Sequence, residues 1–214
     1  MCKRKKKLRI KKETMKNLQK TIILSLLIVV SIGFNSCNQN LLKGWFKAGN
    51  SPKSYKIGLD NSIFQNGEKS AFIESTESDI NGFGTLMQTC SAKEYLGKKV
   101  KMSGFIKTEN ISNWVGMWLR IDSKKNSDMK YFDNMRDRQI KGTINWTKYE
   151  IILDIPTNSN SMNFGVLING TGKVWFDNLS FEVVGKSTEK FNDSLNIGIS
   201  NKLLPKPTNL DFEE

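Results

Sequence analysis

Residues 44–184 form short segments in which apolar and polar side chains alternate, separated by Gly, Asn, Asp and Ser. From Val115 to Ile121, for example, every second residue is apolar. Successive side chains point to opposite faces of a β-strand, so this pattern is typical of antiparallel strands that cover one core. About ten such segments, with no long helical period among them, predict an all-β fold, an antiparallel β-sandwich of the jelly-roll type.

The expected strands follow from this alternation and from the turn residues between the segments. They are residues 45–48, 55–60, 70–76, 84–91, 99–108, 114–122, 130–134, 147–155, 162–168 and 173–184. We therefore expect one domain at residues 44–184, a tether at 37–43, and a polar tail at 185–214 with a short strand at 209–213.

The residues before this domain resemble a bacterial lipoprotein signal. Residues 22–34 are an apolar run of 13 residues (34 − 21), shorter than the roughly 20 that a membrane-spanning helix needs. Lysines precede the run and Ser36-Cys37 follows it, so cleavage after Ser36 would leave Cys37 as a lipidated first residue. We expect a signal-peptide helix within residues 1–36 and anchoring of the protein in the cell envelope, on its periplasmic or outer-membrane face. Plain secretion, a retained anchor and a start at Met15 are the alternatives.

The formal charge of +12 does not indicate nucleic-acid binding, because most of it lies in the leader. Residues 1–36 hold ten basic residues and one acidic residue, a net charge of +9, which leaves 12 − 9 = +3 for the rest. A domain this close to neutrality lacks the basic surface that binds phosphate backbones. We therefore expect no nucleic-acid partner.

Missing residue types exclude several kinds of catalysis. The chain contains no histidine, which excludes Ser-His-Asp and Cys-His nucleophiles and argues against catalytic zinc. It also has neither of the common glycine-rich phosphate motifs, and Cys90 is expected to be a buried, inert thiol. These absences predict a protein that is not an enzyme. A glycosidase is the remaining catalytic alternative. Its two carboxylates would come from Asp122, Asp133, Asp137, Glu150 and Asp154.

Two motifs carry a resemblance to a known superfamily. Residues 67–73 (GEKSAFI) and 174–181 (VWFDNLSF) resemble the galactose-binding-like jelly roll, which includes many carbohydrate-binding modules. The wider sequence, such as residues 44–60, resembles an uncharacterised domain found with some AraC-type regulators and in some exported bacterial proteins. In such domains an Asn-Leu-Asp-Phe-Glu strand is often the first. Here that motif is at residues 209–213, so it either folds back to complete a sheet or marks where a further module began.

The candidate ligand site is one face of the segment at residues 114–122. Alternation places three of its side chains on the face opposite to the apolar one: Trp114, Trp118 and Arg120. Two more polar candidates, Asp133 and Asn134, follow in the next segment. Indole rings can stack on the CH-rich face of a sugar while neighbouring polar groups bond its hydroxyls. The alternative is that both indoles are buried, because tryptophan is mostly buried on average.

The resemblance also implies a structural calcium ion. An acidic residue on the closing strand of such folds often helps to hold calcium, which here implicates Asp177 together with Asp60. A hydrogen-bonded turn is the alternative. Taken together, we expect a non-catalytic envelope lipoprotein that binds a carbohydrate or another small ligand. A structural or protein-docking module of the envelope is the alternative function.

Overall fold

The structure is a computed structural model that describes residues 42–123, 127–190 and 203–214. Across these ranges it contains nine strands and two short 3-10 helices, and it has no α-helix there. The strands are β1 (Phe46–Gly49), β2 (Tyr55–Asp60), β3 (Ser70–Ser75), β4 (Phe83–Ser91), β5 (Lys98–Asp122), β6 (Ser127–Asp133), β7 (Ile140–Ile155), β8 (Ser161–Asn169) and β9 (Lys173–Lys186). The 3-10 helices are η2 (Pro52–Ser54) and η3 (Lys93–Tyr95).

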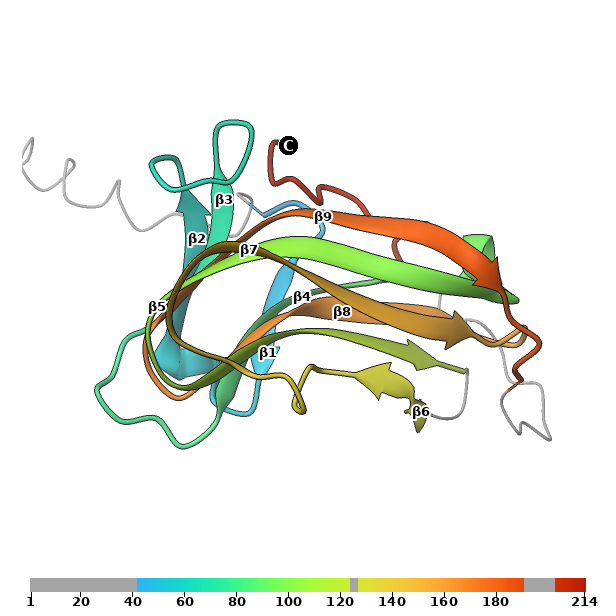
Figure 1. Cartoon of the computed structure of the whole chain (residues 1–214), viewed down its shortest axis with the longest axis horizontal. Helices are drawn as coiled ribbons and strands as arrows, with labels where there is room; N and C mark the ends of the chain where they lie inside the picture. The colour runs from blue at the N-terminus through green and yellow to red at the C-terminus, as the bar shows by residue number, and fades with distance from the viewer. Residues whose placement is uncertain (1–41, 124–126, 191–202) are drawn as a thin grey trace, which may run out of the picture. The chain divides into compact units, whose positions relative to one another are not determined.

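The strands are arranged as two layers that share β5. The first half of β5 pairs with β9 on one side and β7 on the other, and β9 continues through β3 to β2. Its second half pairs with β8 and β6, and β8 continues through β4 to β1. All of these pairings are antiparallel, and β5 and β7 curve around one end of the sandwich (Figure 1). The expected antiparallel β-sandwich is confirmed.

The two strands expected at residues 99–108 and 114–122 are in fact one strand of 25 residues. The bend between its halves contains Asn110, whose φ of +53° lies in the left-handed region. Asparagine tolerates that conformation better than most residues. The pairing of β5 with β7 shifts register three times around the bend. Strand β5 can therefore pass from one layer to the other while it stays paired with β7.

The core between the layers is built by the expected alternation. Val115, Met117, Leu119 and Ile121 of β5 are fully buried, as are Met162, Phe164, Val166 and Ile168 of the neighbouring β8. Burial of one such side chain stabilises the fold by about 1.5–3 kcal/mol. Cys90 is also fully buried, and burial raises the pKa of its thiol to about 12, which suits the expected inert state.

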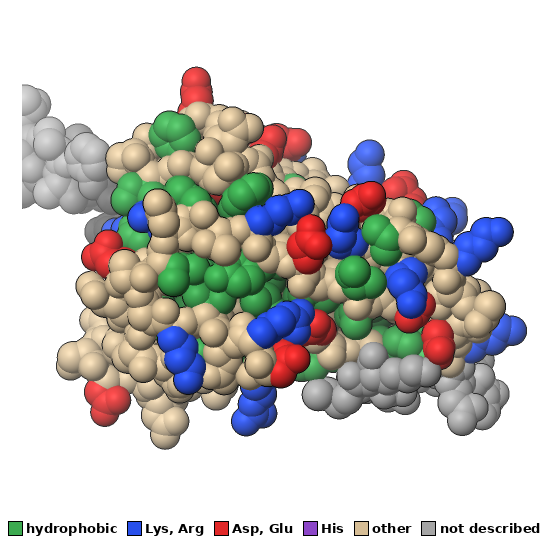
Figure 2. All heavy atoms as spheres, viewed as in Figure 1, with side chains coloured by type: hydrophobic (Ala, Val, Ile, Leu, Met, Phe, Trp, Pro, Cys, Tyr) green, Lys and Arg blue, Asp and Glu red, His purple; other side chains and the backbone are tan. Residues whose placement is uncertain are grey.

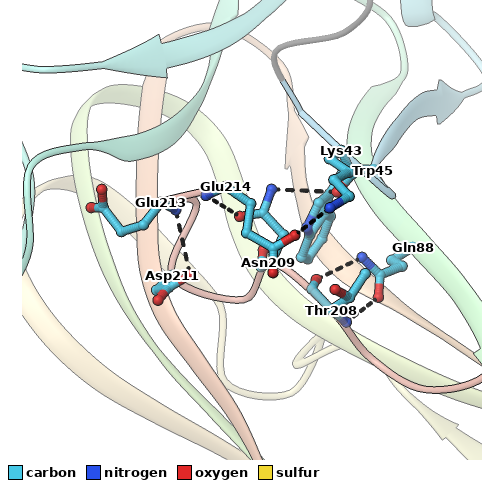
Figure 3. A network of polar contacts seen from close by, with 8 residues as sticks. All are labelled: Lys43, Trp45, Gln88, Thr208, Asn209, Asp211, Glu213 and Glu214. Atoms are coloured by element: carbon cyan, nitrogen blue, oxygen red, sulfur yellow. Dashed lines mark hydrogen bonds and ion pairs between the residues drawn. The ribbon is translucent and has the colours of Figure 1, made fainter.

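Residues 203–214 pack against the sandwich and do not form the strand expected at 209–213 (Figure 3). Asn209 and Phe212 have φ values of +47° and +61°, which are incompatible with an extended strand. The Phe212 ring is fully buried, 5.2 Å from the ring of Trp45 and 5.3 Å from that of Phe176. This part of the expected polar tail therefore contributes to the core.

The predicted leader, signal helix and Cys37 lie outside the described residues. Among the residues that are described, no helix has both the length and the apolar character needed to cross a membrane.

Candidate functional site

The candidate site lies on the outward side of the second layer. It is formed by alternate residues of three neighbouring strands, whose register places Trp118 beside Gly165 and Met87, and Arg120 beside Asn163 and Thr89. We call this surface the β4–β8–β5 face. Its members are Phe83, Thr85, Met87, Thr89 and Ser91 of β4, Ser161, Asn163, Gly165, Leu167 and Asn169 of β8, and Trp114, Gly116, Trp118, Arg120 and Asp122 of β5.

A hydrogen-bonded network crosses all three strands of this face. Arg120 donates from Nε to Asp122 Oδ1 at 2.9 Å and from Nη2 to Asp122 Oδ2 at 2.9 Å. Asn163 Nδ2 donates to the same Asp122 Oδ2 at 2.8 Å, and Thr89 Oγ1 donates to Asn163 Oδ1 at 2.9 Å. Asn163 is buried, whereas the Arg120 side chain keeps 40% of its surface exposed. The network therefore holds one exposed guanidinium in a single orientation.

Trp118 contributes to this face mainly as a buried ring. Its indole Nε1 donates to Thr85 Oγ1 at 2.9 Å, across the position of Gly165 on β8. Thr85 Oγ1 in turn donates to the Val166 carbonyl at 2.7 Å. Only 7% of Trp118 is exposed, so the open indole platform that the sequence suggested is largely covered by the protein itself. Trp114, four residues earlier on the same strand, is half-buried.

Asp133 and Asn134 are not part of this hydrogen-bonded network. Asp133 lies opposite Leu119, a core residue, so its side chain is on the side of the sheet away from the β4–β8–β5 face. There it accepts a hydrogen bond from Arg138 Nη2 at 2.6 Å, at the edge of the sheet. The Asn134 carbonyl lies against Gly116, where a Cβ would come within 2.6 Å of it. The structure thus keeps Trp114, Trp118 and Arg120 on one face, with Trp114 six residues along β5 from Arg120, and places Asn134 at the border of that face.

The sequence suggested Asp122 as a group that bonds sugar hydroxyls, whereas in the structure its carboxylate is paired with Arg120, and sequence reasoning did not single out Asn163 or Thr89. A weak signal existed for Asn163, because it is the only amide in the otherwise apolar run at residues 162–168. Its partners are 74 residues away at Thr89 and 41 residues away at Asp122, so the sequence alone could not connect them.

The two predicted calcium ligands already accept several hydrogen bonds. The Asp177 carboxylate is fully buried and accepts from the backbone N–H groups of Gln65, Asn66 and Asn178. Burial raises its pKa, against the effect of these three donors. The described residues contain no group of three or more Asp, Glu, Cys or His side chains that could hold a metal ion. Calcium binding stays a prediction.

Asp60 is held in a different environment. Its Oδ1 accepts from Ser62 and from the backbone N–H of Ile63, and its Oδ2 accepts from Trp175 Nε1 at 2.8 Å. Burial alone would raise the pKa of Asp60, but these hydrogen bonds outweigh it and lower the pKa to about 2.

The carboxylates of the glycosidase alternative are all ion-paired. Arg120 pairs with Asp122, Arg138 with both Asp133 and Asp137, and two lysines with Glu150 and Asp154. A glycosidase needs two carboxylates that reach one glycosidic bond from opposite sides. On the face shown in Figure 2, acidic and basic side chains are interspersed, as expected for ion pairs on a solvated surface.

Comparison with known proteins gives one relative by sequence. No family model matches the chain. The chain is 41% identical over 174 residues to an uncharacterized HTH-type transcriptional regulator, YbfP, of Bacillus subtilis. The match covers 81% of this chain and 57% of the regulator, so the chain spans little more than half the length of this relative.

Among the solved structures that resemble the sandwich, two illustrate its fold. One is the enzymatically active domain of tailspike protein 4 of bacteriophage CBA120, with a TM-score of 0.52 and 10% identity over 67% of this chain and 20% of the tailspike chain. The other contains the CBM22-1 and GH10 modules of a Clostridium thermocellum xylanase complexed with xylohexaose, with a TM-score of 0.51 and 14% identity over 67% of this chain and 27% of that one. At these identities the similarity shows a shared fold, an antiparallel β-sandwich of the jelly-roll type.

Proposed function

We propose that the sandwich is a non-catalytic binding module whose ligand is a carbohydrate, bound on the β4–β8–β5 face. The observation that carries this proposal is the fixed, exposed guanidinium of Arg120, two positions along β5 from Trp118 on the same face. Arginine has five N–H donors, and Arg120 directs Nε and one edge of Nη2 at Asp122. The remaining N–H groups of the planar guanidinium point away from Asp122, so the hydroxyl oxygens of a sugar can accept hydrogen bonds from them.

Preorganisation is the physical reason to expect binding here. A free arginine side chain loses rotamer freedom when it orders against a ligand, which costs about 0.5–1.5 kcal/mol. Asp122, Asn163 and Thr89 impose that order before any ligand arrives. Trp114 and the exposed part of Trp118 would supply the apolar contact that sugar rings favour.

Two of the comparisons support a binding role. The xylanase modules that share the fold were solved with xylohexaose. The match to the regulator leaves out only 40 residues of this chain (214 − 174), so it includes most of the sandwich. A domain found both in a regulator and behind a predicted export signal is best explained as a module that recognises a small ligand.

A glycan array followed by titration calorimetry tests the proposal. Arg120→Ala should weaken binding at least tenfold, because it removes the positioned donors. Lys101→Ala is the matched control, since Lys101 is also an ion-paired cation on an outward sheet face, 2.7 Å from Glu182, but on the other layer. Failure of the wild-type protein to bind any glycan, or equal binding by Arg120→Ala, would overturn the proposal.

We also propose that the protein is anchored in the cell envelope through lipid on Cys37. The support is the order of basic leader, apolar run and Ser36-Cys37 in the sequence.

A further inference from the structure

The two tryptophans of the β4–β8–β5 face offer little ring surface beside Arg120. Trp118 is only 7% exposed. Trp114 is half-buried, but it lies six residues (120 − 114) from Arg120 along β5, about 20 Å at the rise of a β-strand. The neighbour of Arg120 on β8 is Asn163, which is not aromatic. An aromatic platform next to the guanidinium would therefore have to come from β6, the strand on the other side of β5.

Phe132 of β6 occupies that position. It lies directly opposite Arg120 in the pairing of β5 with β6, so the two side chains are on the same side of the sheet. The Cβ atoms of residues opposed in this way are about 4.5–5.5 Å apart. Phe132 is half-buried, whereas the preceding Tyr131, on the other side of the strand, is only 3% exposed. Phe132 therefore extends the β4–β8–β5 face by one strand with a partly exposed aromatic ring.

Strand register continues this pair into a row across four strands. Thr89 of β4 lies opposite Asn163 of β8, Asn163 lies opposite Arg120, and Arg120 lies opposite Phe132. The polar end of the row is bonded internally, since Thr89 Oγ1 donates to Asn163 Oδ1 at 2.9 Å. The other end is an apolar ring. A pyranose has the same two characters, because its ring faces are rich in CH groups and its rim carries hydroxyl groups.

The outer edge of the Arg120 guanidinium can bind two oxygen atoms at once. Its Nε and one N–H of Nη2 are used by Asp122, on the inner edge of the planar group. On the outer edge, one N–H of Nη1 and one of Nη2 lie side by side and parallel. Such a pair of donors binds both oxygens of a carboxylate or a phosphate. Two hydroxyl oxygens on adjacent carbons of a sugar ring can accept from it in the same way.

We propose that Phe132 and Arg120 form one sugar-binding subsite. In it, the Phe132 ring stacks on the CH-rich face of a pyranose, and the outer edge of Arg120 binds a pair of free hydroxyl groups on adjacent carbons of that ring. The proposal rests on the carbohydrate-binding function proposed above and names the class of sugar. Cellohexaose and mannohexaose belong to this class, because their internal units have free hydroxyls at C2 and C3. The internal units of chitohexaose do not, because an acetamido group replaces the C2 hydroxyl.

Titration calorimetry on the full chain, with the tightest-binding glycan of the array, tests the role of Phe132. Phe132→Ala should weaken binding at least tenfold, because it removes the platform. Phe132→Leu keeps apolar bulk without a ring, so it should weaken binding as well and stays usable if Phe132→Ala fails to fold. Phe132→Tyr keeps the ring and should bind within threefold of wild type. Phe64→Ala is the matched control, since Phe64 is 39% exposed but lies in the loop between β2 and β3 of the other layer.

The class of sugar is tested by comparing glycans on the same protein. Chitohexaose should bind at least fivefold more weakly than the tightest glycan that has free adjacent hydroxyls, and equal binding would overturn the paired contact with Arg120. Glycan binding that Arg120→Ala weakens and that folded Phe132→Leu leaves unchanged would overturn the subsite but keep the proposed function. Absence of any glycan binding by the wild-type chain would overturn both.

Discussion

Replacing Trp118 with alanine is expected to destabilise the protein strongly. Only 7% of the residue is exposed, and its Nε1 donates a hydrogen bond to Thr85. Its neighbour across the sheet is Gly165, which has no side chain to fill the space that the ring would leave. Truncation of a buried tryptophan costs about 3–5 kcal/mol, and each kcal/mol lowers the Tm of a domain of this size by about 2–4 °C. We therefore expect a fall in Tm of roughly 6–20 °C.

Thermal and urea denaturation followed by near-UV circular dichroism would measure this change. Trp118→Phe keeps most of the ring but loses the indole donor, and it should cost only about 1–2 kcal/mol. Trp114→Ala is the matched control, because Trp114 lies on the same face of the same strand but is only half-buried. If Trp118→Ala shifted the Tm by less than about 2 °C while abolishing glycan binding, the ring would be a ligand platform and the reasoning from burial would be refuted.

The remaining predictions concern single groups. Because the pKa of Asp60 is lowered to about 2 from 3.8, its carboxylate stabilises the fold above about pH 4, and this contribution is lost as the pH falls towards 2. Asp60→Asn should lower the free energy of unfolding by about 2 kcal/mol at neutral pH. It should also flatten the pH dependence of that free energy, measured by urea denaturation, between about pH 4 and pH 2; an unchanged pH dependence would contradict this. Gly165→Ala should cost about 1–3 kcal/mol, since a Cβ there would clash with the Leu86 carbonyl oxygen of β4. Gly185→Ala, where the nearest contact is 3.6 Å, should be neutral in the same melts. Cys37→Ser should leave the precursor uncleaved or release the protein from the membrane fraction; a processed, membrane-bound mutant would show that the lipoprotein assignment is wrong. Calcium added after chelation should raise the Tm if Asp60 and Asp177 hold it, and a constant Tm would remove that prediction.

Much of the strand layout could be predicted from local patterns. The strand expected at residues 55–60 has those bounds in the structure, and that expected at 84–91 starts one residue earlier. Alternation along a strand is a local property, because side chains at every second position face the same way whatever the strand pairs with. The outward parity of Trp114, Trp118 and Arg120 followed from the same rule.

Other features were outside the reach of such patterns. The burial of Trp118 comes from partners distant in the sequence, since it lies opposite Gly165, 47 residues away, and bonds to Thr85, 33 residues away. The division of β5 between two layers depends on a bend at Asn110 that resembles an ordinary turn in the sequence. The motif at residues 209–213 suggested a strand that could fold back, but nothing local indicates that Phe212 enters the core from an irregular segment.

The sequence by itself therefore determined the fold class, the approximate strands and the side chains of β5 and β8 that face the core. Only the tertiary structure decided which outward residues become neighbours, which indole is covered and what fills the end of the sandwich. The physical reason is that periodicity is read along one strand, whereas Asp122, Asn163 and Thr89 meet through strand register, which is set by the packing of the whole core.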